Sequence, residues 1–539
     1  MLDQLKQNWK SGITVSLVSI PLSVSLAVAS QTSPVVGIIT AIWAGIIHSL
    51  LGGSNFNIVG PTGALSGILA TYALTHGADS LPMVALVAGT FILLTYLFKW
   101  EKYFTLIPAS AVHGFTLGVA FIIALNQFNF AFGLTQLEKH PHFIENVFES
   151  LTHISSLSLP TTTVFFLFLG SLFFMMRFFP KLPGAIMLAP LGIALGYASQ
   201  QGIIPIDLGT LGEMYPTMTP SLFVPYNVYI SKELITTGAT IAVIAILETM
   251  ISAKIADGMT KSKYDRRKEI LGLAMANIGA GLAGGIPATA ALARTALNVK
   301  TGATHKMSAT ISSIMVALIA FLFLSYFVYI PLAVIAAILV FTAIRMIEVA
   351  HYYRMYHHDK VSFGMAFAVA GITIYEDPII GILVGTTLML LIFMQKLSKG
   401  QFELLMNDEH KHLVNAIQGD EIEKINTVSD TFVYSIKGQL AYINAQAHIS
   451  RFEMNLAKKY NTVVLRLREL YFIDLDGVDA FDEIVDIIHA DGKKVMVTGV
   501  NSFIEQMLTD DSETFQDLTK KGLVFDRTAD ALRSIGFEL

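Results

Sequence analysis

Long apolar runs follow one another along the first three quarters of the chain. From Gly12 to about Lys396 only short polar breaks separate them, whereas from Gly400 onward polar and apolar residues mix as in a soluble protein. A membrane span needs about 20 mostly apolar residues, and fewer where the helix is broken inside protein. The pattern predicts fourteen spans: Gly12–Ser30, Val35–Leu51, Phe56–Leu74, Pro82–Phe98, Phe104–Asn126, Thr161–Phe179, Pro183–Gln200, Glu233–Ala256, Ile270–Gly285, Pro287–Leu297, Lys306–Phe327, Pro331–Arg345, Val361–Tyr375 and Pro378–Met394.

The charges in the short loops orient these spans. With the N-terminus inside, the inside loops carry Lys99, Lys102, Arg177, Lys181, the run Lys261 to Lys268, Lys300, Lys306, Arg354, Lys360, Lys396 and Lys399. The outside loops hold Lys139 and are otherwise acidic or neutral, with Glu138, Asp207, Glu213, Glu376 and Asp377. Because cytoplasmic loops are enriched in Lys and Arg, we expect an even number of spans in a bacterial-type inner (plasma) membrane, with both chain ends in the cytoplasm.

Composition narrows the function. The chain is 53% hydrophobic and 14% charged, against about 25% charged residues in soluble proteins, which indicates lipid as the main solvent. A net charge of −5 argues against a nucleic-acid partner. The absence of cysteine excludes disulfides, thiol catalysis and cysteine-based metal sites. No nucleotide-binding loop, metalloprotease motif or hydrolase constellation is present, so we expect neither an enzyme nor a resident cofactor.

Two segments are too short and too rich in Gly and Pro to be ordinary spans, namely Asn57–Leu65 and Gly284–Leu292. They hold the third and tenth positions, which are equivalent in two repeats of seven. An odd number of spans per repeat inverts one repeat relative to the other, and paired broken helices of this kind point to a transporter's binding site. The alternative is a pair of proline-kinked helices packed through small residues.

Each broken segment is expected to carry a half-helix that begins at its proline. Pro61 and Pro287 suit a first helical turn, where the missing N–H is not needed, and the extended residues before them would bring the chain to mid-membrane. Two such helix starts that face each other would offer free N–H groups and positive dipole ends to an anion. We expect the substrate to contact Pro61, Thr62, Gly63, Ala64, Thr289, Ala290, Ala291 and Arg294.

Charged residues inside spans are costly and are functional hypotheses by default. Glu248 lies near the middle of the eighth span, with Ser252 one turn on and on the same face. Together they would bind a coupling proton or ligate Na⁺; the alternative is an interhelical hydrogen bond. Arg294, about two turns after Pro287, would attract the anion or neutralise Glu248; the alternative is a side chain that snorkels to the cytoplasmic surface.

The residues around these segments resemble the sulfate permease (SulP) family of anion transporters. The pattern is carried by Leu247–Glu248, Ala256–Thr260, Glu269, Asn277, Gly284–Pro287 and Ala293–Thr295, and in the first half by Ile20–Pro21, Pro34, Gly37, Leu51–Gly53 and Gly60–Thr62. The resemblance covers nearly the whole chain, and the tail looks like the family's STAS domain.

This resemblance implies the uracil-permease-type fold, in which fourteen spans form two inverted seven-span repeats divided into a core and a gate domain. The substrate would sit between segments three and ten, against spans one and eight, and transport would be an elevator-like motion of the core. It also implies a homodimer. Residue by residue, the family's acidic residue in span eight matches Glu248. The hydroxyl residue one turn later matches Ser252, and the arginine in span ten matches Arg294.

Two departures bear on substrate and coupling. After the span-one Pro21 the chain reads Leu22 to Leu26, which resembles the bicarbonate and C4-dicarboxylate branches more than plant-type sulfate permeases. Sodium-coupled bicarbonate members place Thr two residues before the span-ten Arg, where this chain has Leu292. The loss of that oxygen ligand favours H⁺ over Na⁺ as the coupling ion, with Glu248 as the proton-binding group.

The tail alternates strands and helices. Thr431–Ile436, Thr462–Leu467 and Lys494–Thr498 are typical of strands, and Ala445–Tyr460, Gly477–His489 and Ser502–Leu508 of helices, which together predict a small α/β layer fold. STAS domains commonly carry Asp-x-Ser/Thr-Gly, and here Asp474 is followed by Asp476 at the hydroxyl position. Asp476 would either cap a helix or mimic a phosphorylated residue permanently.

We therefore expect a transmembrane domain over 1–398, a linker and the start of the tail over 399–427, and a STAS domain over 428–539 that is open to a cytoplasmic regulator. The chain is predicted to be a secondary-active transporter of small anions: bicarbonate, sulfate or C4-dicarboxylate. The alternatives are an anion-gated sensor or channel that signals through the tail, and a nucleobase transporter on the same fold. Arg294 and the tail argue against the nucleobase transporter.

Overall fold

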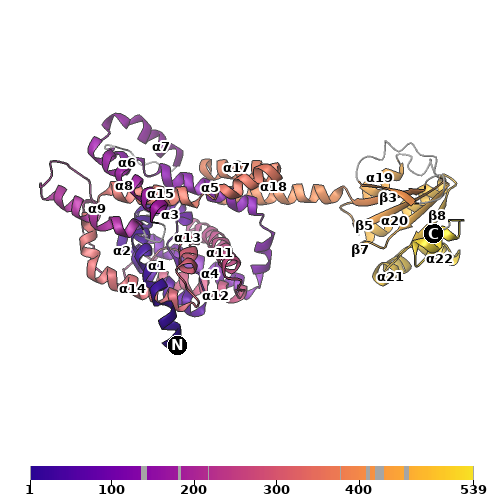
Figure 1. Cartoon of the computed structure of the whole chain (residues 1–539), viewed down its shortest axis with the longest axis horizontal. Coiled ribbons are helices and arrows are strands. Elements are labelled where there is room, and N and C mark those ends of the chain that lie inside the picture. The colour runs from indigo at the N-terminus through magenta and orange to yellow at the C-terminus, as the bar shows by residue number, and fades with distance from the viewer. Residues whose placement is uncertain are drawn as a thin grey trace. The chain divides into compact units, whose positions relative to one another are not determined.

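The computed structural model describes residues 2–134, 137, 143–179, 184–216, 218–376, 378–407, 413–418, 430–453 and 461–537. The chain divides into two compact units, Met1–Thr387 and Leu388–Leu539, which Figure 1 shows as a helical bundle and an α/β layer. Of the loop charges used for orientation, Glu138, Lys139, Lys181 and Asp377 lie outside the described residues.

The first unit is helical. Its helices are α1 (Leu2–Ala29), α2 (Pro34–Leu51), α3 (Gly63–His76), α4 (Leu81–Leu97), α5 (Ala109–Leu125), α6 (Phe128–Phe132), α7 (Phe143–Thr152), α8 (Leu159–Phe178), α9 (Gly184–Gln200), α10 (Leu211–Met214), α11 (Lys232–Thr260), α12 (Arg266–Leu282), α13 (Leu292–Lys300), α14 (Met307–Phe323), α15 (Leu332–Met346), α16 (Val349–His358), α17 (Lys360–Tyr375) and α18 (Pro378–Ser398), the last of which continues into the second unit. Each of the fourteen predicted segments overlaps one of these helices.

Local chemistry sets several helix starts. The Ser33 hydroxyl accepts a hydrogen bond from Val35 N–H at the start of α2, where Pro34 is the first helical residue, and the Asp265 carboxylate caps α12 through Lys268 N–H. Both satisfy backbone donors that a helix leaves open at its N-terminus.

Nine helical stretches among the described residues are long and apolar enough to cross a membrane. Some of them leave most of their apolar surface uncovered: in α8 only 22% of the most apolar stretch is buried, and Leu167 is 63% exposed. Such contiguous apolar surface is suited to lipid and not to water. The remaining predicted segments are shorter, and α3 and α13 have 14 and 9 residues.

The helices of the first unit pack in two groups. Helix α12 packs on α4 and α2, α1 on α14, and α11 on α4 and α13. In the second group α5 packs on α17 and α15, and α15 packs on α8. The groups meet where α3 contacts α5 and where α1 contacts α15 and α9.

The second unit holds a seven-stranded sheet in the order β4-β3-β5-β6-β8-β9, with β7 paired to β5. Its strands are β3 (Gln401–Asn407), β4 (Leu413–Gln418), β5 (Thr431–Leu440), β6 (Thr462–Arg466), β7 (Leu470–Ile473), β8 (Lys494–Thr498) and β9 (Val524–Phe525). Strands β5, β6, β8 and β9 are parallel, and β3 joins them antiparallel. Alternate residues of β5 enter two separate cores, Phe432 and Tyr434 one of them and Val433 the other, because successive strand side chains point to opposite faces.

Helices α19 (Ala445–Arg451), α20 (Leu475–Ala490), α21 (Ser502–Asp511), α22 (Glu513–Lys520) and α23 (Thr528–Arg533) complete this unit. The predicted α/β layer fold of the tail is confirmed. Of the predicted helix Ala445–Tyr460, residues 454–460 lie outside the described chain. The segment 399–427, predicted as a linker and the start of the tail, contributes β3 and β4 to the sheet.

Candidate functional site

The two broken segments lie side by side in the first unit. Strand β1 (Val59–Gly60) pairs antiparallel with β2 (Thr289–Ala290), with Val59 opposite Ala290 and Gly60 opposite Thr289. Beyond this pair Ala291 N–H donates to Ile58 O at 3.3 Å, and Ile58 N–H donates to Thr295 Oγ1 at 3.2 Å. The prediction that segments three and ten meet is therefore confirmed.

The half-helices do not begin at the prolines, and that expectation is wrong. Helix α3 begins at Gly63 and α13 at Leu292. The residues after Pro287 stay extended because β2 is hydrogen-bonded to β1, and because Asn277 binds both the N–H and the carbonyl of Ala288 at 2.9 Å. Arg294 consequently lies in the first turn of α13 and not two turns into it.

Both half-helix N-termini lack a side-chain cap. Neither Thr62, which precedes α3, nor Ala291, which precedes α13, accepts a capping hydrogen bond through its side chain. The first-turn N–H groups of Gly63 and Ala64 are therefore available to a ligand, as are those of Leu292 and the residue after it. A helix N-terminus with open donors favours negative charge.

Arg294 crosses from α13 to the other broken segment. Its side chain is 2% exposed, and Nη2 donates to Pro61 O at 2.6 Å. The guanidinium packs so closely on β1 that a Cβ on Gly60 would lie 2.8 Å from Nη1. Nε and Nη1 have no hydrogen-bond partner among the described atoms. The side chain therefore does not snorkel to a surface, and it holds two buried donors that a bound anion would satisfy.

Glu248 on α11 faces the start of α3. Thr62 Oγ1 donates to Glu248 Oε2 at 3.1 Å, and the Glu248 side chain is only partly buried while Thr62 is buried. Within the described residues no ion pair joins Glu248 to Arg294 at 4.0 Å or less. The guanidinium and the carboxylate therefore contact adjacent residues of the same broken segment, Pro61 and Thr62, without forming an ion pair with each other.

The predicted partner Ser252 makes no such contact. It is fully buried, and its Oγ has no hydrogen-bond partner among the described atoms. Thr249, which sequence reasoning missed, does the positioning: its Oγ1 lies 2.9 Å from Thr289 Oγ1 and accepts from Ala290 N–H at 3.2 Å. The sequence feature that could have identified Thr249 is its position next to Glu248, because adjacent side chains on α11 lie about 100° apart around the helix axis.

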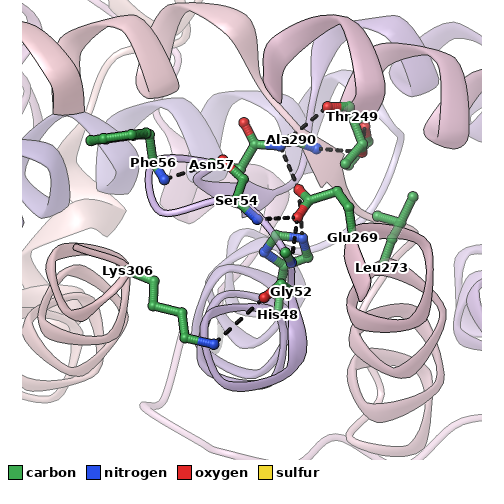
Figure 2. Close-up of polar contacts among 12 residues, drawn as sticks. His48, Gly52, Ser54, Phe56, Asn57, Thr249, Glu269, Leu273, Ala290 and Lys306 are labelled. Atoms are coloured by element: carbon green, nitrogen blue, oxygen red, sulfur yellow. Dashed lines mark hydrogen bonds and ion pairs between the residues drawn. The ribbon is translucent and has the colours of Figure 1, made fainter. Parts of the chain in front are cut away.

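A buried carboxylate on α12 anchors the approach to β1 (Figure 2). Glu269 is fully buried; its Oε2 accepts from Gly53 N–H at 2.8 Å and from Ser54 N–H at 2.7 Å, and its Oε1 accepts from Asn57 Nδ2 at 2.6 Å. His48 Nε2 lies 3.0 Å from the same Oε1. The loop that leads into β1 is therefore fixed by one acidic side chain.

Asn57 extends this network towards the paired strands. Its Nδ2 also donates to Thr249 O at 3.1 Å, so a chain of polar contacts runs from Glu269 through Asn57 to Thr249 and on to Ala290 (Figure 2). We call these four residues the Glu269 network. The family-like sequence pattern includes Glu269, but nothing in the pattern shows which residues this carboxylate binds.

A cavity of about 570 Å³ opens beside the far end of α3. Its lining includes Tyr72, His76, Glu233, Glu376 and Thr373. None of the predicted substrate or coupling residues lines it, so the paired half-helix starts are closed from this cavity in the described chain.

In the tail, the residue that caps α20 is Asp474. Its Oδ1 accepts from Gly477 N–H at 2.9 Å and its Oδ2 from Tyr442 N–H at 3.2 Å. Asp476 is exposed in the first turn of α20. The prediction that Asp476 caps a helix is therefore wrong. The side chain that caps a helix belongs to the extended residue directly before it, which is Asp474 here.

Two family models match the chain: the sulfate permease family over residues 5–369 and the STAS domain over residues 421–521. A putative sulfate transporter, YvdB, of Bacillus subtilis is 30% identical over 514 residues, which cover 94% of each protein. The bicarbonate transporter BicA of Picosynechococcus is 22% identical over 414 residues, which cover 73% of this chain and 70% of BicA.

Solved structures share the fold. The murine Slc26a9 anion transporter in its inward-facing state superposes with a TM-score of 0.83 at 12% identity and covers 99% of this chain and 92% of its own. The transmembrane domain of a cyanobacterial BicA gives a TM-score of 0.62 at 20% identity, over 71% of this chain and 98% of its own. At these identities the likeness concerns the fold: a helical membrane transporter, followed in this chain by a STAS domain.

Proposed function

The chain belongs to the sulfate permease family, whose members are anion transporters and not enzymes, and we propose that it is a secondary-active transporter of one small anion. Relatives named as sulfate and bicarbonate transporters support an oxyanion as substrate. The chain is a multi-pass membrane protein with a STAS domain at its C-terminal end.

One observation carries this proposal: two uncapped half-helix N-termini meet at the β1–β2 pair, with two unpartnered donors of the buried Arg294 beside them. Open backbone donors, helix dipoles and a guanidinium all favour an oxyanion. Pro61, Thr62, Gly63 and Ala64 would contact it from one side. Thr289, Ala290, Ala291 and Arg294 would contact it from the other.

We further propose that Glu248 carries the coupling proton. Its bond from Thr62 ties it to the first residue before α3, so gain or loss of a proton would change the hydrogen bonding at one half-helix start. The hydroxyl of Ser252 would join Glu248 only if Na⁺ were bound, since it makes no hydrogen bond of its own here. The free Oγ therefore keeps sodium as the alternative coupling ion.

The same proposal covers architecture and motion. Fourteen spans would form two inverted repeats, with β1–α3 and β2–α13 as equivalent broken segments, in a bacterial-type inner membrane with both ends cytoplasmic. The grouping of α1–α4 with α11–α14 supports a core that moves against the second group in an elevator-like way. The transporter would act as a homodimer, and a cytoplasmic partner would act through the STAS domain.

The test of the site is saturable uptake of labelled sulfate, bicarbonate and fumarate into proteoliposomes that contain only this protein. Arg294→Ala should abolish saturable uptake of the transported anion, whereas Arg177→Ala, an exposed arginine at the end of α8, should leave it within twofold. Equal uptake by wild type and Arg294→Ala would show that the anion does not bind at this position.

A further inference from the structure

Three potential metal ligands that take no part in the anion site meet between α5 and the start of α16. His113 lies near the start of α5, Glu348 directly precedes α16, and His351 lies in its first turn. One nitrogen or oxygen donor from each lies within 4.8 Å of the other two. His113 Nδ1 is 4.0 Å from Glu348 Oε2, and the His113 and His351 ring centroids are 3.8 Å apart.

The backbone between these helices is held in place independently of the three ligands. Tyr352 Oη donates to His113 O at 2.5 Å, and its ring packs edge-on against both His113 and Phe367 of α17. Helix α5 also packs on α17 along its length. Since α16 is anchored this way, the donors converge through the fold, and only side-chain rotation is needed to adjust them.

The three donors are not used elsewhere. Among the described residues, no side-chain hydrogen bond is made by His113, Glu348 or His351. Each of them is partly exposed, so the three ligand atoms are not sealed inside the fold.

Two imidazole nitrogens and one carboxylate oxygen are the ligand set of many zinc sites, whereas Mg²⁺ and Ca²⁺ prefer oxygen ligands alone. Bonds of about 2.0–2.1 Å put tetrahedral donors roughly 3.3 Å apart. The three ligand atoms lie within 4.8 Å of one another. Each side chain would therefore need to move by about 1 Å or less to bind one ion.

We propose that His113, Glu348 and His351 form a binding site for one divalent transition-metal ion of the zinc type. The ion joins α16, the short helix between α15 and α17, to α5. This site is distinct from the anion site and stands whether or not the transport proposal holds. No sequence pattern revealed it, because His113 is more than 200 residues from its partners along the chain.

The experiment is titration of tag-free full-length protein in detergent with Zn²⁺, and with Co²⁺ as a spectroscopic probe. The chain has no cysteine, so no thiolate competes. Wild type should bind one equivalent tightly, and Co²⁺ should give the visible absorption of a four-coordinate site. His351→Gln and Glu348→Gln should each weaken binding by at least about tenfold, the loss seen when even an outer partner of a metal ligand is removed.

The matched control is the double variant His357→Gln, His358→Gln, which removes two exposed histidines from the same helix and should bind as wild type does. A rise in unfolding temperature with Zn²⁺ in wild type and in the control, but not in His351→Gln, would agree with the site. The proposal is overturned if wild type binds no equivalent, or if His351→Gln and Glu348→Gln bind as tightly as wild type.

Discussion

Replacing Glu269 tests whether the Glu269 network positions the anion site. The carboxylate accepts two backbone N–H groups and the Asn57 amide while fully buried. In Glu269→Gln the new NH₂ group must face either the two loop N–H groups or the Asn57 amide, so at least one buried donor loses its partner. In Glu269→Ala all three donors lose it.

The magnitude follows from these contacts. One lost hydrogen bond to a charged group costs about 1.5–3 kcal/mol, and each donor left unsatisfied in the interior about 1–3 kcal/mol. We expect Glu269→Gln to lower the free energy of unfolding by about 2 kcal/mol. Glu269→Ala should lower the free energy of unfolding by about 3 kcal/mol or more, which is a large share of the total stability of an ordinary domain.

Two readouts separate positioning from a general loss of stability. Glu269→Gln should lower the temperature of half-inactivation in detergent, and it should also raise the KM for the transported anion by about tenfold, because 1.4 kcal/mol of lost positioning corresponds to tenfold. Glu145→Gln, an exposed carboxylate on α7, should change neither quantity. In a double-mutant cycle, Glu269→Gln and Asn57→Ala should couple by about 0.5–3 kcal/mol.

The reasoning would be refuted by a Glu269→Gln protein with wild-type thermal stability and wild-type KM. Strict additivity with Asn57→Ala would equally show that the two side chains do not act together.

Three further predictions concern smaller changes. Thr249→Val removes the hydroxyl that accepts from Ala290 N–H and should raise the KM by about fivefold to tenfold for a cost of about 1–1.4 kcal/mol, while Thr236→Val, an exposed hydroxyl on the same helix, should not; equal KM values would contradict the role given to Thr249. Burial lowers the pKa of His448 from 6.5 to about 3, so the unfolded chain binds a proton that the folded tail does not, and the free energy of unfolding of a separately expressed 400–539 tail should fall by up to about 1.4 kcal/mol per pH unit below pH 6.5. His448→Gln should reduce this slope in denaturant titrations and the exposed His489→Gln should not, and an unchanged slope in both would count against it. Asp474→Ala should cost the same tail about 0.5–2 kcal/mol, whereas Asp476→Ala should stay within about 0.5 kcal/mol; the reverse order would restore the cap to Asp476.

Local patterns of apolar and polar residues predict much of the fold. Apolar runs of span length locate the long helices of the first unit, and short stretches that alternate or run apolar locate β5, β6 and β8 in the tail. The Gly- and Pro-rich segments at Asn57–Leu65 and Gly284–Leu292 also indicate that a helix is interrupted there, since Gly and Pro are unfavourable in the interior of a helix.

Long-range pairing is what the sequence leaves open. The residues after Pro287 stay extended because β2 hydrogen-bonds to β1, which is distant along the chain, and no local propensity encodes that interaction. For the same reason Thr249 and not Ser252 contacts β2, and Glu269 finds Asn57 and the loop amides. Residue type predicts that a buried carboxylate has partners, but not which partners.

The most direct test of secondary-active transport is concentrative uptake into proteoliposomes of labelled bicarbonate, sulfate and fumarate, each under an imposed proton or sodium gradient, for wild type and Glu248→Gln. We predict that one anion accumulates above its external concentration only with a proton gradient, and that Glu248→Gln still equilibrates this anion but no longer accumulates it. Accumulation of none of the three under either gradient would contradict secondary-active transport and favour a channel or a sensor.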